Sequence, residues 1–131
     1  MFREDWVKVV EDVVKELSRK FRVEAAIVFG SWTRSGGGEW SDVDLLVITD
    51  DVRSVNPLDR FYISVEFRRY GVDLFLYTYD EFERMCLKGN PLTLSALLEG
   101  LYVVSNEKVL TLRGRLYSKY RRDGRVWIRL E

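Results

Sequence analysis

Apolar residues near the start of the chain recur at spacings of three and four, which predicts an amphipathic helix over residues 5–21. A short apolar run at 25–29 ends at Gly30 and predicts a buried strand, and a second apolar run at 43–48 predicts another. A third run, at 72–77, is again rich in residues that favour strands. The first half of the chain therefore predicts a helix followed by strands of a protein core.

The segment between the second and third strands has two interpretations. Pro57 suits the start of a helix that runs to residue 70 and ends at Gly71, but apolar alternation over 61–67 also permits a strand. Beyond the third strand, Thr78 and Glu81 have capping-box spacing. The further elements expected are helices at 79–88, 91–99 and 107–122, a short strand at 101–104, and a tail at 125–130 that suits an edge strand or a partner-binding segment.

Composition narrows the chemistry that the chain can carry out. The 131 residues fit one domain, and the single cysteine, Cys86, cannot form an internal disulfide. The absence of histidine argues against zinc sites and histidine acid–base catalysis, so carboxylate oxygens remain as metal ligands. The 21 basic and 21 acidic residues cancel, which argues against a wholly basic nucleic-acid-binding surface. With no membrane-span-length apolar run and a charged N-terminus, a cytoplasmic protein is predicted.

The segment from Gly30 to Asp44 carries the candidate chemistry. Gly30 has no Cβ, so a phosphate group can come close to its backbone, and Ser31 offers a hydroxyl and can cap a helical turn that attracts anions. Asp42 and Asp44 are two positions apart at the second strand, so their carboxylates share one face and suit a divalent metal ion. Each feature alone is more often structural, as a plain turn or a solvated strand end.

The residues between these two features predict a mobile loop beside the site, because the triple glycine 36–38 favours neither helix nor strand. Arg34 lies in this loop and is long enough to reach a triphosphate. The loop therefore adds one candidate phosphate-binding residue.

Gly30-Ser31, ten further residues and then Asp42-x-Asp44, with a strand on either side, together resemble the minimal nucleotidyltransferase family of the DNA polymerase beta-like superfamily. The resemblance continues to Asp73, where a third acidic strand residue is expected, and covers residues 5–105. Residues 106–131 then form a C-terminal helix and tail of the same single domain. The implied fold is α/β (α+β), with a small mixed sheet and helices mainly on one face.

The resemblance also implies a reaction, the transfer of a nucleoside monophosphate, AMP from ATP, to a hydroxyl group with two Mg²⁺ ions. Asp42 and Asp44 would ligate both metals, and Asp73 would ligate the metal at the acceptor and act as general base. Gly30 and Ser31 would hold the β- and γ-phosphates. The acceptor stays open between a protein tyrosine, an RNA end and a small molecule, as do the base preference, the oligomeric state and binding of nucleic acid.

Family members of this size resemble the antitoxin of toxin–antitoxin pairs, whose partner is an all-helical HEPN protein that receives AMP on a tyrosine. Tyr117, Tyr120 and Trp127 lie among arginines near the C-terminus and are candidates for the partner interface. A C-terminal helix packed on its own sheet is an equal alternative. Two other functions stay open: a nucleotide-binding module without turnover that acts through a partner, and an interaction protein whose acids are incidental.

Overall fold

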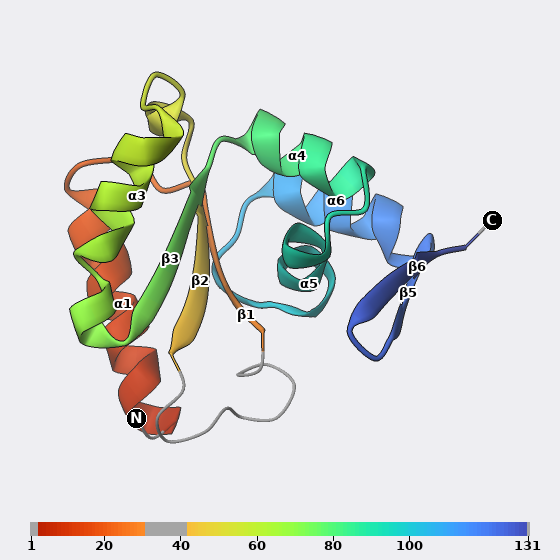
Figure 1. The fold of residues 1–131 in the computed structure, drawn as a ribbon, viewed down its shortest axis with the longest axis horizontal. Coiled ribbons are helices and arrows are strands. Elements are labelled where there is room, and N and C mark those ends of the chain that lie inside the picture. The colour runs from red at the N-terminus through yellow and green to blue at the C-terminus, as the bar shows by residue number, and fades with distance from the viewer. Residues whose placement is uncertain (1–2, 31–41, 131) are drawn as a thin grey trace.

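The computed structural model describes residues 3–30 and 42–130 (Figure 1). Its main feature is a four-stranded sheet in the order β3-β2-β1-β4. β1 runs antiparallel to β2 and β4, whereas β2 and β3 are parallel, so the sheet is mixed. The strands are β1 (Ala25–Phe29), β2 (Val43–Ile48), β3 (Val72–Tyr77) and β4 (Leu101–Val104).

Five α-helices of the described residues surround this sheet: α1 (Arg3–Ser18), α3 (Pro57–Val65), α4 (Tyr79–Leu87), α5 (Pro91–Glu99) and α6 (Glu107–Tyr117). Two short 3-10 helices, η1 (Asp50–Val52) and η2 (Arg68–Tyr70), flank α3 in the chain. A separate hairpin of β5 (Tyr120–Asp123) and β6 (Val126–Arg129) follows α6. No helix within the described ranges has the length and apolar character needed to cross a membrane.

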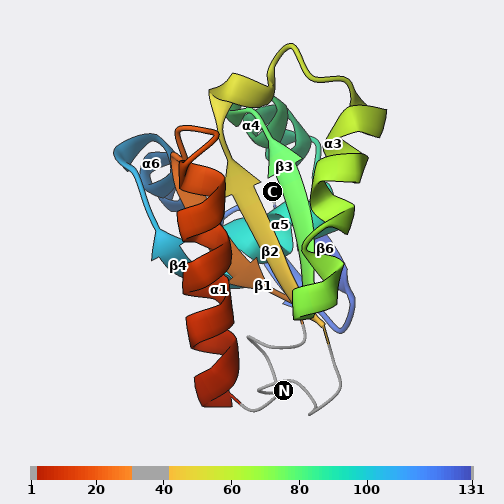
Figure 2. The ribbon, with the colours of Figure 1, turned by 90° about the vertical axis from the view of Figure 1, so that its left-hand side faces the viewer.

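The helices cover both faces of the sheet, so the α/β class is confirmed but the expected placement of helices mainly on one face is wrong. Figures 1 and 2 show α1 and α3 on one side of the sheet and α4, α5 and α6 on the other. The cause lies in the central strands, because all five positions of β1 are buried and both faces need a cover. Val10, Val13 and Leu17 pack on one face, and Phe82, Leu97 and Leu112 belong to the core on the other.

The segment after η1 is a helix, and the alternative strand over 61–67 is wrong. Asn56 accepts a hydrogen bond from the backbone N–H of Asp59, and Pro57 begins α3, so a helix start is encoded locally. The helix ends earlier than predicted, at Val65, and a 3-10 turn continues to Gly71. The predicted capping box of Thr78 and Glu81 is confirmed at the start of α4.

The C-terminal region differs from the predicted helix over 107–122, because α6 ends at Tyr117 and the chain turns into the hairpin. The hairpin is stabilised by the pairing of β5 with β6 and by the packing of Tyr120 and Trp127 against the core. Arg122 donates two hydrogen bonds to the Glu99 carboxylate and one to Ser95 Oγ, and Trp127 Nε1 donates to the same hydroxyl at 3.1 Å. The tail is therefore an antiparallel strand, as one interpretation predicted, and it packs on α5 of its own chain.

Candidate functional site

Strand pairing brings the predicted carboxylates to one end of the sheet. β2 and β3 are parallel, and their register places Asp44 directly beside Asp73. β1 is antiparallel to β2, and its last residue, Phe29, pairs with Asp44, so Gly30 follows at the same end. Three segments far apart in sequence thus meet where β1 ends and β2 and β3 begin.

The missing side chain of Gly30 leaves space that the site uses. Its φ of 85° lies in the left-handed region that glycine adopts without strain. A Cβ at this position would lie 2.6 Å from Asp44 Oδ2, closer than real contacts allow. From the sequence we expected a phosphate to come close to the Gly30 backbone, but in the structure the Asp44 carboxylate lies there. A side chain at position 30 would collide with this carboxylate.

The Asp44 side chain is half-buried, and its surroundings disfavour the negatively charged carboxylate. Burial raises the pKa of Asp44 from 3.8 to about 6, and the negative charges of Asp73 and Asp42 add to the increase. Asp42 itself is exposed, one residue before β2 begins. The three predicted carboxylates thus act on one another electrostatically. A cation between them would relieve this repulsion, which is the condition expected of a metal site.

The carboxylates do not form a closed metal site on their own. Among the side chains that the structure describes, those of residues 6–30 and 42–130, no three acidic or other ligating groups stand close enough together to hold a metal ion. The chemistry of the group nevertheless suits Mg²⁺, which prefers hard oxygen ligands and completes its shell with water and substrate phosphates. The side chains that could contribute ligands are those of Asp42, Asp44 and Asp73.

Arg68 is a residue at this site that the sequence analysis missed. Its Nε lies 3.6 Å from Asp73 Oδ1, and its guanidinium lies over the Phe61 ring at 5.3 Å from the centroid. The ion pair offsets part of the negative charge at this end of the sheet. The basic pair Arg68-Arg69 shortly before Asp73 was the signal in the sequence that could have indicated this contact.

Two predicted phosphate-binding residues, Ser31 and Arg34, lie outside the described residues, as does the predicted glycine loop. Their roles stay predictions. The part of the site that the structure describes consists of Gly30, Asp42, Asp44 and Asp73, with Arg68 added.

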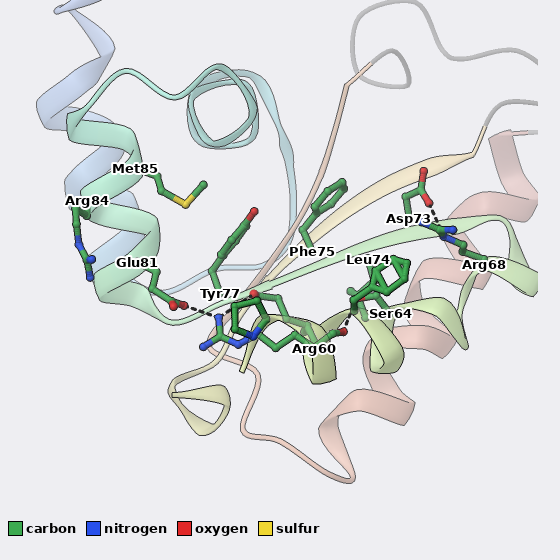
Figure 3. Close-up of a pocket in the computed structure, with 13 residues that line it drawn as sticks. Arg60, Ser64, Arg68, Asp73, Leu74, Phe75, Tyr77, Glu81, Arg84 and Met85 are labelled. Carbon is green, nitrogen blue, oxygen red and sulfur yellow. Dashed lines mark hydrogen bonds and ion pairs between the residues drawn. The ribbon is translucent and has the colours of Figure 1, made fainter. Parts of the chain in front are cut away.

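A groove of about 600 Å³ runs along β3 between α3 and α4 (Figure 3). Asp73, Phe75 and Tyr77 project to the same side of the strand, and Asp73 lies at the end where β3 begins. β3 is one of the two edge strands of the sheet, so the groove lies beside a strand that has one sheet neighbour in the described part of the chain. The Asp73 carboxylate therefore lies at one end of a groove whose lining includes three aromatic side chains, Phe61, Phe75 and Tyr77.

Fold and site together define a small α/β domain that presents paired carboxylates beside a glycine turn, a layout suited to metal and phosphate chemistry. The chain belongs to the nucleotidyltransferase domain family, whose sequence model matches residues 10–122. Among curated proteins, the comparison finds no match.

Solved structures agree with this assignment. A protein from Sulfolobus solfataricus assigned to the nucleotidyltransferases is 28% identical, with a TM-score of 0.54 over 63% of this chain and 75% of that one. A toxin–antitoxin complex with AMP-PNP has 13% identity and a TM-score of 0.54 over 90% and 86% of the two chains. A MntA–HpeT toxin–antitoxin mutant has 12% identity and a TM-score of 0.52 over 90% and 85%. At these identities the two complexes share the fold with this chain.

The resemblance to the minimal nucleotidyltransferase family that the sequence suggested is thereby confirmed. The motif residues Gly30, Asp42, Asp44 and Asp73 all lie within the matched range. The match also extends into the C-terminal hairpin, which ends at Arg129, so most of the chain belongs to the family domain.

Proposed function

We propose that this chain transfers AMP from ATP to a hydroxyl group of another molecule. The observation that carries the proposal is the register of β2 and β3, which sets Asp44 beside Asp73 next to the Gly30 turn. Membership of the nucleotidyltransferase family supports nucleotidyl transfer as the reaction. The ATP analogue AMP-PNP in a complex of the same fold supports ATP as the donor.

In the proposed reaction the acceptor hydroxyl oxygen attacks the α-phosphorus of ATP and forms a new P–O bond. The bond from the α-phosphorus to the oxygen that bridges to the β-phosphorus breaks, and pyrophosphate leaves with its electron pair. The hydroxyl proton passes to the Asp73 carboxylate, which acts as general base. The Arg68 Nε lies 3.6 Å from Oδ1 of this carboxylate, and the second oxygen can accept the proton.

Magnesium would be held by Asp42, Asp44 and Asp73 and would, when bound, activate the acceptor oxygen and neutralise the charge of the departing pyrophosphate. The chain's own contribution is to bury Asp44 partly and to hold Asp73 and Asp42 near it, which together raise the pKa of Asp44. The missing Cβ of Gly30 leaves room for the Asp44 carboxylate, and we assign the backbone of Gly30, together with Ser31 and Arg34, to the phosphates. In the MntA–HpeT mutant, two aspartates two positions apart are replaced by glutamate, the spacing of Asp42 and Asp44.

A protein partner is part of the proposal. Both toxin–antitoxin neighbours function as pairs, and the family resemblance suggests a helical HEPN-type protein as the second component. The structure alters one expectation about the interface: Tyr120 and Trp127 are half-buried against the core cluster on α4, α5 and α6. The hairpin thus has an intramolecular role. Helix α6 packs Val109, Leu112 and Leu116 into the same core, which supports the alternative of a C-terminal helix packed on its own sheet, whereas Tyr117 is exposed.

One alternative function uses the same residues, a nucleotide-binding module without turnover, because nucleotide binding and nucleotidyl transfer would both use Gly30, Asp42 and Asp44. Calorimetric titration with AMP-PNP and Mg²⁺ tests nucleotide binding. Incubating the protein and its copurifying partners with α-labelled ATP then tests turnover. We expect label on a partner. Binding without any labelled product would support the silent module, and no binding at all would refute a nucleotide site.

Asp73→Asn separates catalysis from fold in the same assay. The amide keeps the shape of the side chain but cannot take the acceptor proton, so labelling should nearly vanish while the protein stays folded. Asp80→Asn, which changes an exposed carboxylate at the start of α4, is the matched control and should label normally. Wild-type labelling by Asp73→Asn would show that the third carboxylate is wrongly assigned.

A further inference from the structure

Helix α3 exposes an apolar face that no other described element covers. None of its residues is buried, although Leu58, Phe61, Tyr62 and Val65 follow the spacing of one helix face. Their exposed fractions are 61%, 46%, 62% and 39%. An amphipathic surface helix normally turns such a face toward the core, and a contiguous exposed apolar patch marks an interaction site. We refer to these four residues as the α3 stripe.

The α3 stripe is connected to the candidate active site. Phe61 belongs to the stripe and also lines the groove along β3. The Arg68 guanidinium lies over the Phe61 ring and pairs with Asp73, as the dashed line in Figure 3 shows. A molecule that covers the stripe therefore contacts Phe61, whose ring lies under the Arg68 guanidinium that pairs with Asp73. From the stripe, the same molecule can extend along the groove to Asp73.

The chemistry of the stripe selects among possible occupants. A nucleic acid would need cations spread along its phosphates, whereas the stripe itself presents two aliphatic and two aromatic side chains and has Arg68 and Arg69 beyond one end. A small molecule would be accommodated in the groove and would not need an apolar face outside it. Four anchors at positions i, i+3, i+4 and i+7 match packing against another helix.

Positive charge at one end of the stripe indicates the charge of the molecule that binds there. Arg68 and Arg69 lie beyond the C-terminal end of the stripe, on the side of the chain that leads to β3. Arg69 stacks on Tyr70 at 4.8 Å and has no ion pair with the described residues, while Arg68 shares its charge with Asp73. Acidic side chains would complement this end.

Resting on the proposed function, we propose that the α3 stripe docks an amphipathic helix of the acceptor protein whose acidic end faces Arg68 and Arg69, and that the groove leads the adjoining acceptor segment to Asp73. The stripe holds the partner and the groove orients its hydroxyl group. The C-terminal hairpin is a separate region whose Arg122 and Trp127 are engaged by Glu99 and Ser95.

Two tyrosines allow a matched test of this proposal. Tyr62 on α3 and Tyr117 at the end of α6 are exposed to 62% and 61%, and Tyr117 is the exposed member of the C-terminal interface candidates. Tyr62→Glu and Tyr117→Glu therefore place the same charge on the two competing surfaces. The probe is a phage-displayed library of random peptides about 15 residues long, selected on the wild-type protein with Mg²⁺ and AMP-PNP. Dissociation constants of the recovered peptides are then measured for all three proteins.

We expect recovered peptides with apolar residues at helical spacing and an acidic end. Tyr62→Glu should weaken their binding about tenfold or more, and Tyr117→Glu should leave it unchanged. Leu58→Glu is a second stripe variant in case Tyr62→Glu does not fold, which circular dichroism and Tm will show. Both tyrosine variants should bind Mg²⁺ with AMP-PNP as the wild type does.

Three results of the peptide measurement would overturn the proposal: no peptide above background, peptides that bind Tyr62→Glu as tightly as wild type, or peptides that lose binding with Tyr117→Glu instead. A wild-type dimer that becomes a monomer only in the stripe variants would show that a second copy occupies the stripe, and this would also overturn it. Failure of the wild type to bind AMP-PNP is a distinct result, and it would refute the proposed function. Peptide docking is measured separately, so failure of the docking proposal and failure of the proposed function can be told apart.

Discussion

Replacing Asp44 with asparagine tests whether the fold holds its carboxylates together against their own repulsion. Burial and the charges of Asp73 and Asp42 raise the pKa of Asp44 from 3.8 to about 6. This difference corresponds to about 3 kcal/mol at roughly 1.4 kcal/mol per pKa unit, and because the side chain is partly exposed, solvent screening reduces it to about 1–2 kcal/mol. Asparagine has nearly the same shape without the charge, so it should remove this cost.

The pH at which the effect appears follows from the sign of the change. The folded-state pKa of Asp44 lies above the unfolded value, so the folded protein binds this proton more tightly than the unfolded chain does. Wild-type stability is therefore lost as pH rises from about 4 through about 6. Without Mg²⁺, Asp44→Asn should be more stable than wild type by about 1–2 kcal/mol at about pH 7.5. At about pH 3, below both pKa values, Asp44 is mostly protonated in the folded and the unfolded state, and the difference should close.

Urea denaturation at several pH values, with a chelator present, measures this difference. The same variant should also lose the stabilisation that Mg²⁺ with AMP-PNP gives the wild type, because it lacks a metal ligand. Asp12→Asn is the control, since Asp12 is an exposed carboxylate 3.8 Å from Lys8 and should lose only a few tenths of a kcal/mol. The reasoning is refuted if Asp44→Asn is less stable than wild type at neutral pH, or if the difference does not change with pH.

Three further predictions concern other parts of the fold. Gly30→Ala should weaken calorimetric binding of Mg²⁺ and AMP-PNP because its Cβ displaces Asp44, whereas Gly89→Ala, with φ of 81° and its nearest neighbour 3.5 Å away, should show only a backbone cost of about 1–2 kcal/mol. Arg60→Met should lower the free energy of unfolding by about 2–4 kcal/mol, because this guanidinium donates to three backbone carbonyls and to Glu81. Deleting residues 120–131 should lower Tm by uncovering α5, without changing nucleotide affinity.

Each of these predictions has a result that contradicts it. Equal nucleotide affinity for Gly30→Ala and Gly89→Ala would show that the turn does not position Asp44. A change below about 1 kcal/mol for Arg60→Met would mean that the carbonyls find other donors. Unchanged Tm after the deletion would show that the hairpin does not stabilise α5, and lost nucleotide affinity would place the hairpin near the site.

Local patterns in the sequence determined most helices and strands. The capping box of Thr78 and Glu81 and the proline at the start of α3 act over a few residues, so the sequence alone indicated both helix starts. The spacing of Asp42 and Asp44 and the position of Gly30 are likewise local, and with Asp73 they sufficed to indicate the nucleotidyltransferase family.

The end of α6 shows where local pattern failed. The apolar spacing of 107–122 continues past Tyr117, but Tyr120 pairs across the hairpin with Arg129, and Gly124 adopts a φ of 63° at the turn between the strands. The Asp123-Gly124 dipeptide was a hairpin signal in the sequence. Pairing and packing on α5 outweighed the helical periodicity, because the hairpin gains contacts from distant residues.

Only the tertiary structure decided how the candidate site is assembled. Strand order and direction set Asp73 beside Asp44, although 28 residues separate them in the sequence. The pairing of Arg68 with Asp73, the groove along β3 and the exposed face of α3 likewise depend on which elements lie next to one another. The sequence by itself determined the residue types and their local elements, since these follow from short-range forces. Their convergence depends on long-range strand pairing and on which faces of the sheet the helices cover, and local sequence patterns do not specify either.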